Sequence, residues 1–390
     1  MKILLLTLPL REEPTLFPPV AITRLINGLE GSGYNDIDFY NCDYIRPGND
    51  EIINYVNNSN PDIIGISAVV STSYRYTKNL SASLRKNFPN TPQIVGGNLA
   101  ASADVILEFC PVDLCVIGPG DDIIVELCKH FEKFKSFEVN KELIKIKGIV
   151  YRNTENDEKF IFSGYATQPI PKNIDWDVLK RYNQPLDFYM GRGDTFMNYQ
   201  RDPRAKEEHR LGKRFTTLFT TNGCVAKCTF CHRWSKGYQM FEIDPLVKYI
   251  KYLMDEYNVG FVTIADENFG SSRKQVEEFC EKIAPLDVLW YTAGVRVRNV
   301  DEELIRKMKE SGCTTLYYGI ESGSAKMLKI MEKNATLELN YKAMVSAQKN
   351  DMWTIIQYVI GMPGETNQTI NETIEFSKKC RKLFADNYKI

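Results

Sequence analysis

The first third of the chain alternates short apolar runs with amphipathic stretches. In residues 20–30, for example, Ile22, Ile26 and Leu29 fall on one face of a helix. Short apolar strands separated by helices are typical of a parallel sheet that is covered on both faces. The pattern therefore predicts a doubly wound, Rossmann-like (flavodoxin-like) α/β domain over residues 1–135. Its expected strands are residues 2–8, 36–41, 62–69, 93–95 and 114–117.

A second α/β pattern occupies residues 215–390. Its first run, Phe215-Thr-Thr-Leu-Phe-Thr-Thr221, is β-branched and apolar, as a buried strand should be. Amphipathic stretches such as residues 246–256 and 301–311 separate the runs that follow. The pattern predicts a partial (β/α)6-type barrel of which about five units are present. The further expected strands are residues 260–265, 288–295, 314–319 and 354–361.

Residues 136–214 between these domains are less regular and predict a connector. Residues 148–152 and 159–162 indicate a hairpin, and the prolines of residues 168–171 indicate a linker. Residues 201–214 hold six Lys or Arg against three Asp or Glu. This basic stretch is interpreted as a solvated face, with contact to an anionic ligand as the alternative.

The composition excludes some function classes. The chain of 390 residues holds 49 Lys and Arg against 50 Asp and Glu, a net charge of −1, which argues against a main role in binding nucleic acid or anionic membranes. No uncharged apolar run approaches the roughly 20 residues that span a bilayer. The short apolar start runs into Arg11 without a small-residue cleavage site, so we expect a buried strand there and a cytoplasmic protein.

Small and polar residues follow three successive strands of the first domain. They lie in residues 67–73, 96–98 and 118–121, where ligands bind in doubly wound sheets. Glycines allow close approach of the backbone to a ligand, and hydroxyls supply polar contacts. Each segment alone is also compatible with an ordinary turn, but their succession favours a nucleotide-like ligand. No Gly-x-Gly-x-x-Gly follows the first strand, which disfavours a dinucleotide.

The ten cysteines fall into two groups. Seven are scattered through apolar segments and are expected to be small buried hydrophobes: Cys42, Cys110, Cys115, Cys128, Cys280, Cys313 and Cys380. The other three, Cys224, Cys228 and Cys231, lie within eight residues, directly after the strand at 215–221. Zinc would require a fourth ligand, and the adjacent His232 has poor geometry for the same ion. Three cysteines instead suit a 4Fe–4S cluster with one iron left open.

The spacing Cys224-x-x-x-Cys228-x-x-Cys231, with an aromatic residue just before the last cysteine, identifies the chain as a member of the radical S-adenosylmethionine (SAM) superfamily. The resemblance implies that these cysteines hold a 4Fe–4S cluster whose open iron binds SAM. Residues 266–269 take the place of the motif for the methionine amino group, and Arg296 is placed for the carboxylate. Residues 319–324 take the place of the ribose contact, and residues 360–365 lie where the adenine binds. The implied SAM-binding residues are Phe230, Asp266, Glu267, Asn268, Arg296, Gly319, Glu321, Ser322, Ile360 and Gly361.

The first domain resembles the cobalamin-binding domain that precedes some radical SAM cores. The matching segments are Pro18-Pro19, Gly33-Tyr34 and residues 61–67, 95–97 and 118–121. The resemblance implies cobalamin contacts from Ser67, Val69, Ser71, Thr72, Gly96, Gly97, Asn98, Gly118, Gly120 and Asp121.

One departure from that family concerns cobalt. Many cobalamin proteins carry an Asp-x-His-x-x-Gly loop after the first strand, whereas the histidines here are His130, His209 and His232. Cobalamin would therefore bind without a protein histidine on the metal. Its lower face would meet the loop at residues 68–74.

The resemblance implies reductive cleavage of SAM to a 5′-deoxyadenosyl radical, with ferredoxin or flavodoxin as the electron donor. The leading hypothesis is cobalamin-dependent methyl transfer to an unactivated carbon of a small molecule. A radical cyclisation or rearrangement without methylation is the alternative, and a non-catalytic cobalamin or SAM sensor is a third hypothesis. A methylthiotransferase is disfavoured, because the first domain has no second set of clustered cysteines. Neither the substrate nor a catalytic side chain is indicated.

The family core has six β/α units, whereas residues 215–390 supply five. Residues 384–390 have the pattern of an approach to a sixth strand. We therefore expect the chain to be a fragment, truncated at its C-terminus.

Overall fold

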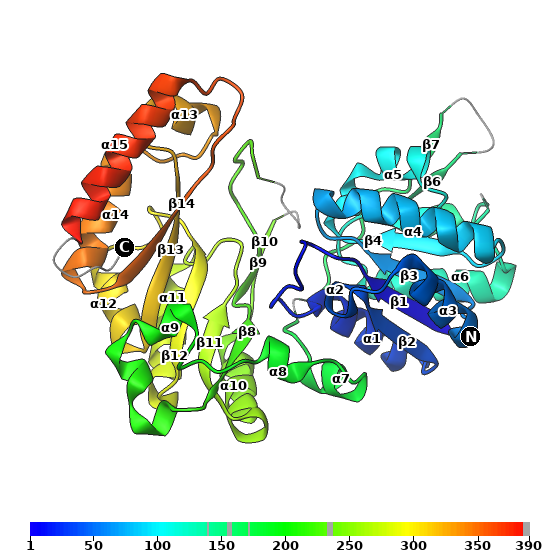
Figure 1. Ribbon diagram of the computed structural model, residues 1–390, viewed down its shortest axis with the longest axis horizontal. Helices are drawn as coiled ribbons and strands as arrows, with labels where there is room; N and C mark the ends of the chain where they lie inside the picture. Colours follow the sequence, from blue (N-terminus) through cyan, green and yellow to red (C-terminus); the bar gives the residue numbers. More distant parts are fainter. Residues whose placement is uncertain (139, 154–157, 171, 232–236, 385–390) are drawn as a thin grey trace. The chain divides into compact units, whose positions relative to one another are not determined.

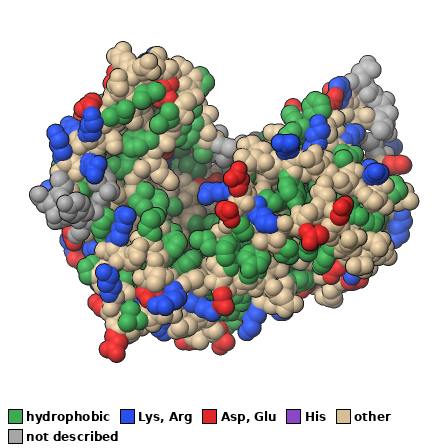
Figure 2. All heavy atoms as spheres, viewed as in Figure 1, with side chains coloured by type: hydrophobic (Ala, Val, Ile, Leu, Met, Phe, Trp, Pro, Cys, Tyr) green, Lys and Arg blue, Asp and Glu red, His purple; other side chains and the backbone are tan. Residues whose placement is uncertain are grey.

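The computed structural model describes residues 1–390 except 139, 154–157, 171, 232–236 and 385–390 (Figure 1). The chain divides into two compact units, Met1–Tyr189 and Met190–Ile390. Both are α/β, as the sequence predicts. Within the described residues, no helix combines the length and the apolar character that a membrane crossing requires. Basic and acidic side chains are interspersed on the face shown in Figure 2, in keeping with the near-zero net charge.

The first unit is built on a sheet with the strand order β2-β1-β3-β4-β5-β6-β7. The first five strands are parallel, and their order is that of a flavodoxin-like doubly wound sheet, which confirms the predicted class. All five residues of β1 are buried, as expected for a strand covered on both faces. The parallel strands are β1 (Ile3–Thr7), β2 (Ile37–Asn41), β3 (Ile63–Ser67), β4 (Gln93–Gly96) and β5 (Leu114–Val116).

Two groups of helices cover this sheet. Helix α1 packs beside α6, whereas α4 packs beside α3 and α5. Leu4, Leu6 and Ile64 belong to one core cluster with buried residues of α3, α4 and α5. The alternate residues, such as Ile3 and Leu5, point to the other face because side chains alternate along a strand. The helices are α1 (Val20–Gly31), α2 (Cys42–Ile45), α3 (Asn49–Ser59), α4 (Tyr74–Asn87), α5 (Ala103–Phe109) and α6 (Asp121–Phe134).

The predicted hairpin exists, but it is not part of a separate connector. Its strands β6 (Ile149–Arg152) and β7 (Phe160–Phe162) extend the first sheet, because β6 pairs antiparallel with β5. Helices α7 (Trp176–Arg181) and α8 (Leu186–Tyr189) also belong to the first unit. The Asn41 amide donates to Gln184 and to the Tyr189 hydroxyl, each at 2.8 Å. The structure therefore divides residues 136–214 between the two units.

The second unit holds a parallel sheet with the strand order β14-β13-β12-β11-β8. These are the five strands expected from the pattern. A small antiparallel pair, β9 (Thr221–Gly223) and β10 (Tyr238–Met240), which the sequence did not suggest, follows β8. The parallel strands are β8 (Arg214–Leu218), β11 (Val259–Ile264), β12 (Leu289–Val295), β13 (Cys313–Glu321) and β14 (Trp353–Tyr358).

The helices between these strands begin at side-chain caps and bury one face each. Ser272, Asp301 and Thr336 accept hydrogen bonds from the backbone of the first turns of α11, α12 and α14. In α12 the buried residues are Leu304, Ile305 and Met308, spaced along one stripe. The helices are α9 (Met197–Gln200), α10 (Ile243–Tyr257), α11 (Arg273–Ile283), α12 (Glu302–Glu310), α13 (Ala325–Ile330), α14 (Leu337–Lys349) and α15 (Asn367–Leu383).

The two faces of this sheet carry different packing. Trp290 of β12 packs against Phe279 of α11, whereas the next residue, Tyr291, packs against Tyr199 of the short helix α9. The Tyr199 hydroxyl lies 3.0 Å from the Thr263 hydroxyl, and Tyr199 is fully buried. Helix α9 therefore fills the face opposite α11 and closes it with aromatic side chains.

Small residues continue this inner face toward the carboxyl ends of the strands. Two positions beyond Thr263, Tyr291 and Tyr317 on the three central strands stand Ala265, Ala293 and Gly319, all half-buried. Because side chains alternate along a strand, these residues share the face that α9 covers lower down. The inner face is thus filled by aromatic side chains toward its amino-terminal end, and three central strands carry small residues toward its carboxyl-terminal end.

Tyr199→Ala should lower the free energy of unfolding of the second unit by about 3–5 kcal/mol, because it empties the centre of the aromatic cluster. Tyr199→Phe loses only the hydroxyl contact with Thr263 and should cost about 1 kcal/mol. Denaturant titration of both variants followed by circular dichroism measures the difference. Equal losses for the two variants would show that the ring is not a packing element.

Candidate functional site

The three clustered cysteines differ from the rest in exposure. Cys224 and Cys228 are half-buried and Cys231 is exposed, in the loop that follows β9. The other seven cysteines are buried, as predicted. Burial raises the pKa of Cys42 and Cys128 to about 12, so these two thiols stay protonated at neutral pH. Only the clustered thiols are therefore accessible as metal ligands.

The clustered thiols share one electrostatic neighbourhood. Burial, then the nearby Cys228, Cys224 and Glu267, raises the pKa of Cys231, while Lys333 lowers it. In the described part of the chain, no three His, Cys, Asp or Glu side chains already stand in a closed metal-binding arrangement. The donor set itself, three cysteines on one loop, suits an iron–sulfur cluster with one open iron. His232, the nominal fourth ligand, lies outside the described residues.

A buried carboxylate holds the start of the cysteine loop. Asp266, directly after β11, accepts hydrogen bonds from the Thr220 amide at 2.8 Å, the Thr220 hydroxyl at 2.5 Å and the Thr221 amide at 3.1 Å. Gln275 donates to the Thr220 carbonyl at 2.8 Å. Asp266 therefore fixes the turn between β8 and β9, a role that the sequence did not reveal. Its oxygens face this turn, so the implied contact with SAM has no support from the hydrogen bonds seen here.

The far end of the loop rests on the segment that follows α13. The Thr229 amide donates to the Met331 carbonyl, and its hydroxyl donates to the Ile330 carbonyl, both at 3.0 Å. The ring of Phe230 lies 5.9 Å from the Lys333 ammonium nitrogen, in a cation–π arrangement. The cysteine loop is thus held at both ends by residues of the second sheet and its connections.

The two other residues of the acidic segment after β11 have different environments. Glu267 is exposed and lies close enough to Cys231 to raise its pKa. Asn268 is buried and donates to the Ser271 hydroxyl at 2.6 Å, while it accepts from Asn299 at 3.2 Å. Glu267 is therefore the member of this segment with an exposed side chain near the cysteines.

Three predicted SAM residues surround an ion pair at the end of β13. Glu321 and Lys333 approach to 2.6 Å, and their side chains are only 10% and 9% exposed. Arg296 donates to the Lys333 carbonyl at 2.7 Å. A side chain on Gly319 would lie 2.3 Å from the Glu321 carboxylate, so only glycine leaves room for the pair. Ser322 is buried, and its hydroxyl lies 3.0 Å from that of Thr373.

Lys333 was missed by the sequence reasoning. It follows α13 in a segment with no motif and no strand pattern, so nothing in the sequence distinguishes it from a surface lysine. The predicted adenine residues lie further out: Ile360 is 69% exposed, and the Gly361 amide donates to the Glu365 carboxylate.

In the first unit, the loops after β3, β4 and β5 lie at the same edge because the strands are parallel. Gly97 has a φ of 89°, and a side chain there would lie 2.5 Å from the Ala68 carbonyl, so these two loops approach closely. Of the predicted cobalamin residues, Ser71, Thr72 and Gly118 are exposed. The half-buried ones are Ser67, Val69, Gly96, Gly97, Asn98, Gly120 and Asp121.

Two of these predicted residues already have partners within the unit. Asp121 forms a two-pronged ion pair with Arg24 of α1, at 2.7 and 3.0 Å. The Thr72 hydroxyl donates to the Leu10 carbonyl at 2.9 Å, which ties the loop after β3 to the loop after β1. The described histidines lie away from these loops. His130 is buried in α6, and the Nε2 atom of His209, in the second unit, lies 2.9 Å from an Asp287 carboxylate oxygen.

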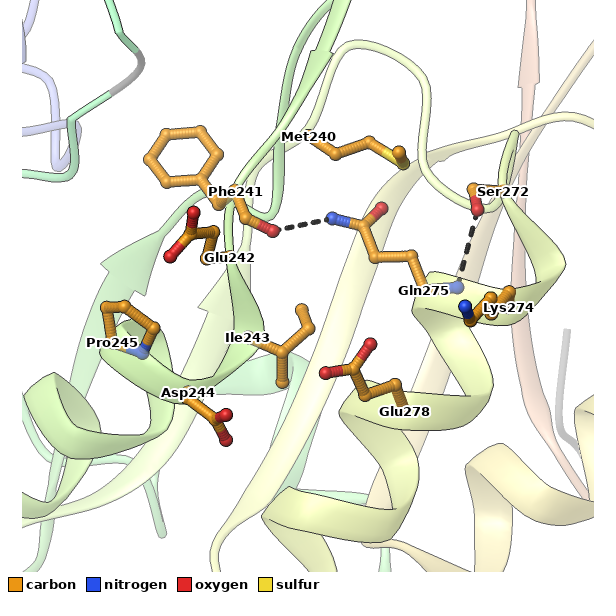
Figure 3. A pocket seen from close by; sticks show the side chains of 10 residues that line it. All are labelled: Met240, Phe241, Glu242, Ile243, Asp244, Pro245, Ser272, Lys274, Gln275 and Glu278. Atoms are coloured by element: carbon orange, nitrogen blue, oxygen red, sulfur yellow. Dashed lines mark hydrogen bonds between the residues drawn. The ribbon is translucent and has the colours of Figure 1, made fainter.

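A separate hollow of about 380 Å³ lies at the start of α10 and α11 (Figure 3). Figure 3 shows the Gln275 amide directed at the Phe241 carbonyl beside it. None of the clustered cysteines or predicted SAM residues line this hollow. It is lined by Met240, Phe241, Glu242, Ile243, Asp244, Pro245, Ser272, Lys274, Gln275 and Glu278.

The two units of the chain match two different protein families. Residues 218–377 match the radical SAM superfamily, and residues 11–128 match the B12 binding domain. The anaerobic magnesium-protoporphyrin IX monomethyl ester cyclase of Cereibacter sphaeroides is 26% identical over 374 residues, 92% of this chain and 56% of the relative. The cytidylyl-2-hydroxyethylphosphonate methyltransferase of Streptomyces wedmorensis is 23% identical over 350 residues, 84% of this chain and 64% of the relative. The chain thus spans less than two thirds of the length of these curated relatives.

Solved structures share the fold over nearly the whole chain. The radical SAM methyltransferase TsrM of Kitasatospora setae, with a TM-score of 0.74 and 16% identity, covers 98% of this chain and 72% of its own. The cobalamin-dependent SAM radical enzyme OxsB, with a TM-score of 0.73 and 18% identity, covers 99% of this chain and 55% of its own. The prediction of a truncated chain concerns residues 384–390, most of which lie outside the described part, and it stays a prediction.

The Asp266 anchor has a pH signature. Burial raises the pKa of Asp266 to about 6 against the opposing effect of its hydrogen bonds, so the folded chain holds this proton more tightly than the unfolded chain does. The contribution of Asp266 to stability is therefore full below about pH 4 and falls as the pH rises to 6, by about 3 kcal/mol. In urea titrations at pH 4 to 7, the free energy of unfolding of the wild type relative to Asp266→Asn should decline by that amount.

The exposed Asp255 provides the control. Asp255→Asn makes the same substitution at a surface carboxylate outside the loop, so it should not reproduce the decline expected for Asp266→Asn. A difference between the wild type and Asp266→Asn that stays constant from pH 4 to 7 would contradict the buried, weakly acidic carboxyl.

Proposed function

Because the chain belongs to the radical SAM superfamily and carries an N-terminal B12-binding domain, we propose that it is a cobalamin-dependent radical SAM methyltransferase. The observation that carries this proposal is the set of three accessible cysteines, Cys224, Cys228 and Cys231, at the carboxyl edge of a parallel sheet, while the other cysteines are buried. The proposed substrate is a small molecule that is methylated at an unactivated carbon.

The residues of the second unit fit a 4Fe–4S cluster with SAM. Three thiols on one loop would hold the cluster at the carboxyl edge of the sheet. When bound, the cluster and SAM together supply the reductive cleavage that starts radical chemistry, with ferredoxin or flavodoxin as the proposed electron donor.

The chain's own side chains would orient SAM and exclude water. Glu267, exposed beside Cys231, is suited to the methionine amino group, because a carboxylate pairs with an ammonium. Glu321 has acceptor oxygens suited to ribose hydroxyls, and the fixed charge of Arg296 is suited to the methionine carboxylate. The aromatic cluster around Tyr199 closes the floor of this face and keeps solvent from the far side.

The first unit supplies the features expected for cobalamin. Gly96 and Gly118 have no atom within 4 Å of where a side chain would begin, so the backbone there is open to a large ligand. Ser67, Ser71 and Asn98 offer hydroxyl and amide groups at the same edge. No described histidine lies on these loops, which supports cobalamin binding without a histidine on cobalt.

The similarity to a cyclase favours a second candidate, a radical cyclisation without methylation. The two reactions differ in what they release from SAM. A methyltransferase forms S-adenosylhomocysteine as well as 5′-deoxyadenosine, whereas the cyclisation forms only 5′-deoxyadenosine.

Cys224→Ala should abolish the visible absorbance of the iron–sulfur cluster after anaerobic reconstitution with iron and sulfide, because one of the three cluster ligands is lost. Cys110→Ala, which changes a buried thiol, should reconstitute to the wild-type iron content. Iron and sulfide analysis of both variants provides the measurement. Wild-type loading of Cys224→Ala would refute the assignment of the loop.

Reconstituted, cobalamin-loaded protein that is reduced and given SAM without substrate should release up to one equivalent of S-adenosylhomocysteine per cobalamin. The reason is that bound cobalamin would accept the methyl group of SAM even before substrate is present. Chromatography of the nucleoside products checks this. Formation of 5′-deoxyadenosine alone would favour the cyclisation, and the absence of both products would favour a non-catalytic sensor.

A further inference from the structure

An unusual backbone surrounds the ion pair between Glu321 and Lys333. Glu321, Glu332 and Asn334 all have positive φ values, of 65°, 49° and 55°. Glu332 is the left-handed residue that ends α13, a common helix ending, whereas Glu321 lies at the end of a strand, where this conformation is unusual for a residue with a side chain. The backbone is therefore unusual at Glu321 and turns sharply on either side of Lys333.

The two left-handed residues that flank Lys333 direct its side chain inward. Glu332 and Asn334 are exposed, whereas Lys333 between them is buried with its ammonium 2.6 Å from Glu321. The amide of Lys333 donates to the Leu328 carbonyl at 3.2 Å, which folds the chain back against the end of α13. On the other side, the pairing of β13 with β14 shifts register between Gly319 and Glu321. Both partners are thus placed by departures from regular structure.

The contacts of this segment reach three parts of the proposed site. The Lys333 ammonium contacts Glu321 and lies over the Phe230 ring at 5.9 Å, while its carbonyl accepts from Arg296. Two residues earlier, the Met331 carbonyl accepts from the Thr229 amide of the cysteine loop. One short segment therefore touches the cysteine loop and two predicted SAM residues.

We infer that Lys333 is a positioning residue that locks the cysteine loop to the SAM-binding side chains Glu321 and Arg296. The inference rests on the proposed function for the ligand, but the locking itself is a property of the chain alone. A buried ion pair adds little net stability compared with apolar residues, so stability alone does not explain why this pair is buried at the end of β13. Its geometry serves instead to fix a carboxylate and a loop in one arrangement.

Lys333→Met tests the lock before any cofactor is loaded. In hydrogen–deuterium exchange of the full chain, the peptide that contains Thr229 should exchange on the order of tenfold faster in this variant, because the segment that binds the Thr229 amide loses its anchor. Lys329→Met is the matched control: Lys329 lies in α13, one turn earlier, with its side chain exposed. This control should exchange as the wild type does.

The second measurement is SAM binding to the reconstituted protein by equilibrium dialysis. Lys333→Met should raise the dissociation constant on the order of 10–100-fold, as is typical when a partner of a binding group is removed. Lys333→Arg keeps the charge and should recover most of the affinity and of the slow exchange, which a loss of packing alone does not explain. Glu321→Gln should also speed exchange at Thr229, because it removes the charge that holds Lys333.

Each outcome is decisive. Exchange and SAM affinity of Lys333→Met that match Lys329→Met overturn the inference. If Lys333→Met does not fold, as judged by circular dichroism, then Lys333→Arg and Glu321→Gln decide by the same two measurements. A wild type that takes up neither iron nor SAM refutes the proposed function, and the exchange comparison still tests the lock.

Discussion

All five strands of the second sheet run parallel, so their carboxyl ends meet at one edge whatever their distance in sequence. This constraint places Thr220 beside Asp266 and Thr229 beside Ile330, pairs that are 46 and 101 residues apart. The cysteine loop begins at the end of the edge strand β8, so it can be held from the neighbouring strand end on one side and from the connection after β13 on the other. A loop with three accessible thiols would otherwise have little to order it, because few of its own side chains are buried.

The same edge also concentrates energetically costly features. Asp266 is a carboxyl that is only 3% exposed and accepts three hydrogen bonds, and Glu321 is a buried acid in a left-handed conformation. Burial of charge and positive φ values at residues other than glycine both oppose folding. The outer face of the sheet, where Trp290 packs against Phe279, shows no comparable cost. Stability is supplied by the ordinary core, and Asp266 and Glu321 place two buried acids at the carboxyl edge of the sheet.

Much of this arrangement could be predicted from the sequence, because it depends on periodicity and on one dense motif. Apolar runs indicated the parallel strands of both units, and the spacing of Cys224, Cys228 and Cys231 indicated the loop. Strand pairing was harder to predict. The hairpin of β6 and β7 was predicted, but no local sequence pattern shows that β6 pairs with β5 and joins the first sheet. Periodicity reports which residues are buried, and it does not report the neighbouring strand.

The side-chain partners at the site were less predictable for a similar reason. Asp266 lies in an acidic segment, and a sequence pattern does not distinguish the carboxylate that turns inward to Thr220 from Glu267, which turns outward toward Cys231. The inward residue supports the loop and the outward one is exposed beside Cys231, so neighbours in sequence have opposite environments.

Lys333 shows even more clearly which kind of residue the sequence alone does not reveal. Its burial depends on two left-handed residues in a connection that has no periodic pattern, and on a glycine 14 positions earlier that leaves space for its partner. Such a residue can be found only once the chain is folded, since the sequence shows an isolated lysine among exposed polar residues. The same holds for the inner face of the sheet, where Tyr199 fills the lower half from a short helix outside the strand pattern. What covers the face of a strand is thus decided by segments that the periodic pattern of the strands does not include, and the cysteine motif alone does not reveal them.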